Sequence, residues 1–189
     1  MIINEMMDLF WNHTISEEEI LSSYRNKVTY ADFKTSLETA NQNKDKKLLK
    51  NTFFVGFWFD FFDEGTGTIL KDLILGNWHS KHEDIAGIFQ RIFHTEKESI
   101  PVLLKAIDTI PEYLQQEDYK YPYIRKLIYA IGAQPEMDNI EALKKLAQSD
   151  DEQIIELALH QIKKRGELGR WDQVKFLGDW VFTHRFSGV

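Results

Sequence analysis

Hydrophobic residues recur at three- and four-residue intervals through the second half of the chain, the spacing of one face of an α-helix. This pattern predicts five helices connected by short links, near residues 80–93, 97–110, 121–132, 139–148 and 151–164. Short links favour antiparallel neighbours, because they leave no slack for a crossover. β-hairpin signals are missing, so the sequence predicts an all-α protein.

Capping residues predict two short helices nearer the start of the chain. Ser16 precedes Glu19 by three residues, the spacing of a capping box. Thr29 can open a further helix that runs through Leu37.

An aromatic helix is predicted over 45–63, with its most apolar part at 53–62. On a helical wheel its large side chains surround nearly the whole circumference and leave a narrow strip at Gly56 and Asp60. We interpret it as a central, buried helix, with a hydrophobic partner or ligand groove as the alternative. The apolar part is half the length that a membrane span needs.

A glycine-rich turn, 64–67, is expected to end the aromatic helix. Thr66 or Thr68 can then cap a segment that runs through Leu75. The turn could also bind an anion, but it lacks the lysine and serine spacing of a P-loop. A helix stop followed by a helix start explains it.

Residues 100–108 and 140–148 form an internal repeat, about 40 residues apart. The positions that correspond are Ile100, Leu103, Leu104 and Ile107 in the first copy, and Ile140, Leu143, Lys144 and Ala147 in the second. A further helix follows each copy, at 123–132 and 153–162. Helix pairs recurring at this interval are typical of HEAT or armadillo solenoids.

Three segments resemble bacterial HEAT-like (PBS-lyase-type) helical repeat proteins. Residues 124–132 are similar to the second helix of such repeats, 150–154 to the acidic turn that opens it, and 78–85 to a segment that precedes the repeats. Ile155 stands where the second repeat would carry arginine. The resemblance implies an all-α, HEAT-like α-solenoid of antiparallel helix pairs that binds another protein, and it extends to small immunity-type proteins.

The expected organisation is a single domain, 1–189. Residues 1–65 form an N-terminal helical cap and 66–166 the HEAT-like repeats. Residues 167–189 form a C-terminal cap, with apolar residues at helical spacing from Trp171 to Phe182. Caps are needed because a solenoid end must cover an apolar face that has no next repeat.

The chain carries 23 basic and 30 acidic residues, a net charge of −7. This charge repels phosphate backbones, so we expect no nucleic-acid partner. Acidic residues are concentrated between Glu5 and Glu19, before the first basic residue, Arg25. A basic protein partner would suit them, and a solvated helical face is the plainer explanation.

Cysteine is absent, which fits a reducing cytoplasm and excludes disulfides and thiol nucleophiles. The first ten residues carry acids in place of the basic and apolar regions of a signal peptide. We therefore expect a cytoplasmic protein without membrane attachment.

His79, His82 and Glu83 are the strongest candidates for a metal site. Their order is not the His-Glu-x-x-His of zincins, and no further ligand is indicated. We expect the imidazoles to bond loop backbone and Glu83 and Asp84 to complement a helix N-terminus, with no metal, cofactor or catalytic residue.

Tyr121, Arg125 and Tyr129 are the leading candidate partner-binding residues, because they share the outward face of the 121–132 helix. The further candidates for partner binding are His79, His82 and Glu83. Tyrosine and arginine are typical of interface hot spots. The alternative is an internal cation–π or salt-bridge cluster that stiffens the repeat.

The resulting hypothesis is a non-catalytic protein-binding module, with an immunity or antitoxin role that neutralises a partner. The alternatives are a HEAT-like DNA glycosylase, for which the charge is unsuitable, and a lyase-like or chaperone-like repeat protein.

Overall fold

The computed structural model describes residues 2–92, 99–134 and 136–168. Within these ranges the chain forms ten α-helices and two short 3-10 helices, and no strand. The all-α prediction is confirmed. None of these helices is both long and apolar enough to cross a membrane.

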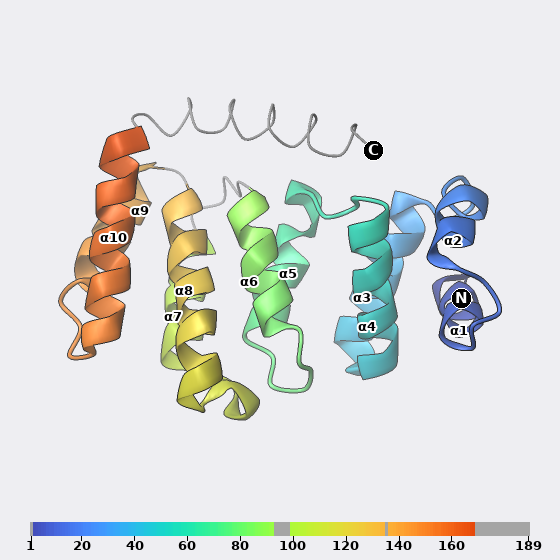
Figure 1. Cartoon of the computed structure of the whole chain (residues 1–189), viewed down its shortest axis with the longest axis horizontal. Coiled ribbons are helices and arrows are strands. Elements are labelled where there is room, and N and C mark those ends of the chain that lie inside the picture. Colours follow the sequence, from blue (N-terminus) through green and yellow to red (C-terminus); the bar gives the residue numbers. More distant parts are fainter. Residues whose placement is uncertain (1, 93–98, 135, 169–189) are drawn as a thin grey trace. The chain divides into compact units, whose positions relative to one another are not determined.

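The chain divides into two compact units, Met1–Ile88 and Phe89–Val189. The first unit contains α1 (Ile2–Trp11), α2 (Glu17–Ser23), α3 (Tyr30–Asn43), α4 (Lys46–Trp58), η1 (Glu64–Thr66), α5 (Gly67–Ile74) and the start of α6 (His82–Arg91). The second contains the end of α6, α7 (Ser99–Asp108), η2 (Glu112–Leu114), α8 (Glu117–Ala133), α9 (Glu136–Leu146) and α10 (Glu152–Leu168) (Figure 1).

The capping residues start α2 and α3 where the sequence predicts. The Ser16 hydroxyl accepts a hydrogen bond of 3.2 Å from the Glu19 amide, and the Ser16 amide donates one of 2.7 Å to the Glu19 carboxylate. Thr29 and Asp32 exchange the same pair of bonds at the start of α3. Both capping boxes satisfy backbone donors that the first helical turn leaves unpaired.

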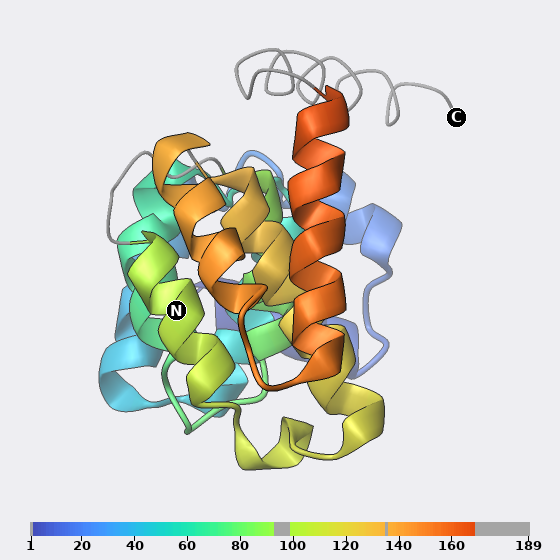
Figure 2. The same cartoon turned by 90° about the vertical axis from the view of Figure 1, so that its left-hand side faces the viewer.

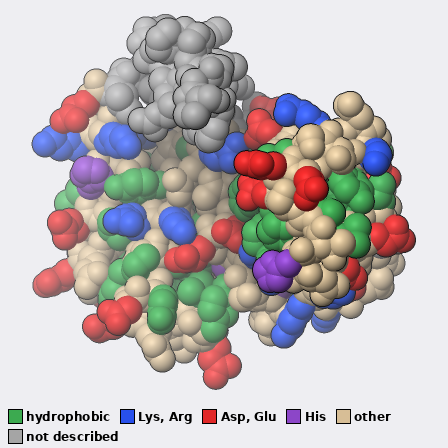
Figure 3. Space-filling model, turned by 45° about the vertical axis from the view of Figure 1, so that its right-hand side comes forward, with side chains coloured by type: hydrophobic (Ala, Val, Ile, Leu, Met, Phe, Trp, Pro, Cys, Tyr) green, Lys and Arg blue, Asp and Glu red, His purple; other side chains and the backbone are tan. Residues whose placement is uncertain are grey.

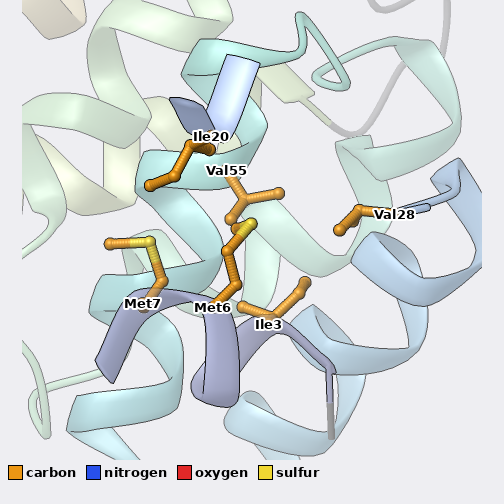
Figure 4. Close-up of a cluster of buried hydrophobic side chains, with 6 residues drawn as sticks. All are labelled: Ile3, Met6, Met7, Ile20, Val28 and Val55. Carbon is orange, nitrogen blue, oxygen red and sulfur yellow. The ribbon is translucent and has the colours of Figure 1, made fainter. Parts of the chain in front are cut away.

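The first unit has an apolar core to which α1, α2 and α4 contribute. Its buried side chains are Ile3, Met6, Met7, Ile20, Val28 and Val55 (Figure 4). The three residues from α1 recur at i, i+3 and i+4, so one helical face supplies them all.

The predicted extent of the aromatic helix is wrong. α4 ends at Trp58, and the chain reverses through Asp60, whose φ of 55° lies in the left-handed region. The Phe61 amide then donates a hydrogen bond of 2.9 Å to the Gly56 carbonyl, which closes the helix end.

The reversal also covers Gly56, which lies in the narrow strip that the helical wheel leaves without large side chains. A Cβ atom on this glycine would lie 2.5 Å from Phe62 Cε2 and 2.7 Å from Phe33 Cε2. Gly56 is buried because Phe62 lies beyond the helix end and folds back over it. Phe53 is fully buried and Phe57 is 42% exposed, so the aromatic segment contributes mainly, though not wholly, to the core.

The glycine-rich turn is a helix stop followed by a helix start. It forms η1, and α5 begins at Gly67. Thr66 occupies the N-cap position, but its hydroxyl donates to the Asp63 carbonyl at 2.7 Å and does not accept an amide of α5. The Thr66 side chain therefore stabilises the turn itself and does not cap α5.

In the second unit, α7 packs against α8, α8 against α9 and α10, and α9 against α10 (Figures 1 and 2). The predicted inward register is confirmed, since α7 buries Ile107, at 7% exposed, and α9 fully buries Leu143. On α8, the four residues predicted to face inward are all fully buried: Ile124, Leu127, Ile128 and Ile131. The predicted C-terminal cap from Trp171 to Phe182 lies outside the described residues.

Candidate functional site

A surface hollow of about 590 Å³ lies in the second unit between α8 and α10. Its lining residues are Tyr121, Pro122, Arg125 and Tyr129 from α8, and Gln153, Glu156, Leu157 and His160 from α10. The structure thus brings the three predicted residues of α8 together in one hollow. The opposite face of α8 is filled by buried aliphatic side chains, so the Tyr-Arg face is not needed for the core.

Tyr121 is held in place at one end of the hollow. Its hydroxyl donates a hydrogen bond of 3.0 Å to Asp151, whose carboxylate also lies 3.4 Å from Lys120 Nζ. Burial opposes the charge of Asp151, yet hydrogen bonds from Tyr121, the Ile154 amide and Lys120 hold its pKa below the ordinary value. Asp151 stays ionised and links the start of α10 to α8.

Tyr129 is held in place at the other end. Its ring stacks on His160 of α10, with centroids 6.3 Å apart and an interplanar angle of 20°. Lys164 Nζ lies 5.5 Å from the centre of the same ring. The predicted alternative of an internal stiffening cluster therefore describes Tyr121 and Tyr129 in part.

Arg125 lies between the two tyrosines and is exposed. Among the residues that the structure describes, it forms neither an ion pair with a carboxylate nor a cation–π contact with a ring. Glu156 lines the same hollow and is likewise without an ion pair to a described residue. The guanidinium is available to an incoming group.

His79, in the loop that follows α5, and His82, the first residue of α6, are both buried in the first unit, and neither lines the hollow. Their Nε2 atoms donate hydrogen bonds of 2.9 Å to the Leu73 carbonyl and 2.7 Å to the Gly76 carbonyl. The rings stack with centroids 4.5 Å apart, and Trp78 packs edge-on against the first of them. The predicted bonding of the imidazoles to loop backbone is confirmed by the Gly76 carbonyl for His82 and by the Lys81 amide, which donates a hydrogen bond of 3.1 Å to His79 Nδ1; the Leu73 carbonyl belongs to the last turn of α5.

Burial and the neighbouring His82 charge lower the pKa of His79 to about 4. Burial also lowers the pKa of His82, although its bond to the Gly76 carbonyl opposes the shift. Both rings are neutral near pH 7. Glu83 lies in the first turn of α6, where an acidic side chain complements the helix dipole as predicted.

No group of three His, Cys, Asp or Glu side chains in the described ranges is placed to hold a metal ion. With both imidazoles buried and occupied by carbonyl groups, we place the candidate docking surface at the α8–α10 hollow.

The sequence did not identify the α10 wall of the hollow. Gln153, Glu156, Leu157 and His160 recur at i, i+3, i+4 and i+7, so they share one helical face. That spacing was a usable signal, but it does not say which helix lies opposite. The pairing of α8 with α10 is a tertiary feature.

Comparisons of the chain with protein-family models, with curated proteins and with solved structures found no match. The resemblance to bacterial HEAT-like repeats stays a prediction from the sequence.

Proposed function

We propose that this chain is a non-catalytic, HEAT-like helical repeat module that docks a protein partner in the hollow between α8 and α10. One observation carries the proposal: Tyr121, Arg125 and Tyr129 share an outward face of a helix whose inward face is already filled. Tyrosine and arginine are the residue types most enriched at interface hot spots, together with tryptophan. Tyrosine buries a large surface with few rotatable bonds, and arginine presents its hydrogen-bond donors in a rigid, planar guanidinium group.

The helix order supports the repeat part of the proposal. α7 with α8 and α9 with α10 are successive packed pairs, and their first helices carry the 40-residue recurrence. Solenoids bind partners on extended surfaces made by equivalent helices of neighbouring repeats. α8 and α10 are such equivalent helices, and together they line the hollow.

An immunity-type or antitoxin-type role is the more specific form of this proposal. It is supported by the resemblance of residues 66–166 to small bacterial HEAT-like proteins and by the net charge of −7, which suits neutralisation of a basic enzyme.

Affinity capture with wild-type protein and matched variants tests the proposal. Arg125→Ala and Tyr129→Ala should each weaken capture of the cognate partner at least about tenfold, or 1.4 kcal/mol, with the melting temperature nearly unchanged. Lys144→Ala is the control, since it removes an exposed side chain of α9 outside the hollow. If both hollow variants bind as wild type does, the partner uses another face, and the acidic segment from Glu5 to Glu19 is the next candidate.

A further inference from the structure

We infer that the group docked in the α8–α10 hollow is an acidic peptide segment of the partner, with a carboxylate paired to Arg125 and apolar side chains beside it. This inference rests on the proposed docking function. It runs against the chain's net charge of −7, which by itself favours a basic partner.

The local charge of the hollow differs in sign from that of the whole chain. Lys120 and Asp151 neutralise one another at 3.4 Å. Of the other charged side chains, Arg125 and Glu156 line the hollow, and Lys164 lies against the ring of Tyr129. These three carry two positive charges and one negative charge. Acidic and basic side chains are interspersed over the face of the protein shown in Figure 3, so the net charge of the chain does not fix the charge at a given place on its surface. Screening weakens the effect of charges that lie more than about 10 Å from a docked group.

The chemistry of Arg125 points to a carboxylate in particular. An exposed arginine without an internal ion pair presents five donors in a planar fork, which matches a carboxylate in a bidentate geometry. Glu156 lines the same hollow but does not pair with it. The partner can therefore supply the anion without breaking an existing ion pair of this arginine.

The walls of the hollow favour a peptide over a small molecule. Tyr121 is fixed by Asp151, and Tyr129 by His160, so two aromatic surfaces are already ordered on either side of the guanidinium. Ordered side chains lower the entropy cost of association. Pro122 and Leu157 add apolar surface between them. All these residues lie on the outside of two helices, whereas small-molecule sites enclose most of their ligand.

A phage-displayed random peptide library, panned on the full-length protein, tests the inference. Wild type should select peptides enriched in Asp or Glu next to apolar residues. Arg125→Glu should select Lys or Arg at the same place. The control is Lys144→Glu, which makes the same charge change on α9 outside the hollow and should select the wild-type sequences. A selected acidic peptide, synthesised with a fluorophore, should bind Arg125→Ala at least tenfold more weakly by fluorescence polarisation, and added salt should weaken wild-type binding.

The outcomes separate the inference from the function on which it rests. Selected peptides that need Tyr129 but carry no acidic residue would overturn the acidic segment and leave docking at the hollow intact. Failure to select peptides, or peptides that bind Arg125→Glu and Tyr129→Ala as well as wild type, would overturn both.

Discussion

Replacing Gly56 with alanine should destabilise the first compact unit, because the space that a Cβ needs is already filled. Three ring carbons of Phe62 and Phe33 lie within 2.8 Å of the position where it would stand. In protein structures, non-bonded carbon atoms essentially never lie closer than 3.0 Å to a Cβ atom. Neither ring can move away freely, since Phe33 is fully buried and Phe62 is 9% exposed.

The magnitude follows from two opposing effects. Alanine in place of glycine inside a helix stabilises by about 1 kcal/mol. Insertion of a methyl group into a well-packed core costs about 1 to 3 kcal/mol, and sometimes more. With two rings in the way, we expect the upper part of that range and a net loss of about 1 to 2 kcal/mol.

Gly87→Ala is the matched control. Gly87 also lies inside a helix, in the part of α6 that belongs to the first unit. Apart from its chain neighbours and the backbone of its own helix, nothing lies within 4 Å of its Cβ position. This substitution should stabilise by about 0.5 to 1 kcal/mol. Urea denaturation followed by circular dichroism measures both variants, and the two should differ in sign.

A second substitution ties the effect to the ring of Phe62. In a Phe62→Leu background, Gly56→Ala should cost less than in wild type, because the closest clash is removed. Contacting residues typically couple by about 0.5 to 3 kcal/mol in such a cycle. If Gly56→Ala stabilises as Gly87→Ala does, Phe62 does not fold back over α4, and the described end of that helix is wrong.

Three further predictions concern the core, the buried histidines and metal. In urea titrations, Ile107→Ala and Leu143→Ala should each lower the free energy of unfolding by about 2 to 5 kcal/mol. Leu159→Ala, at a site 53% exposed, should change it by less than about 0.5 kcal/mol. Equal effects at all three sites would show that the inward register is wrong. His79 has a folded pKa of about 4, below its ordinary 6.5, so the unfolded chain binds more protons between these values. The stability that the neutral His79 ring contributes is fully present above pH 6.5 and is lost as the pH falls through about 4. Over that window, the difference in free energy of unfolding between wild type and His79→Gln should shrink by about 3 kcal/mol. A constant difference would contradict the buried, neutral ring. After dialysis we expect no stoichiometric zinc by mass spectrometry, and one equivalent that disappears in a His79→Ala, His82→Ala double variant would reveal a site there.

Local signals in the sequence were sufficient for the starts of α2 and α3 and for the inward face of α8. They did not predict α1 as a separate helix, and α8 begins at Glu117, four residues before the predicted start at 121. Capping residues such as Ser16 and Thr29 act within one helical turn, and the burial of Ile124 and Leu127 follows from a 3.6-residue period. These effects depend only on neighbours along the chain. They can therefore be read without knowledge of the fold.

The sequence by itself determined the helical class, the starts of α2 and α3, the inward register of α7, α8 and α9, and three of the eight residues that line the candidate site. Only the tertiary structure decided that α4 stops at Trp58, because a left-handed Asp60 and the return of Phe62 over Gly56 are stabilised by packing. The tertiary structure also decided that α10 forms the second wall of the hollow, opposite α8. Periodicity shows which face of α10 is outward, but only the packing of helices places His160 against Tyr129, since contacts between helices depend on how whole faces fit together.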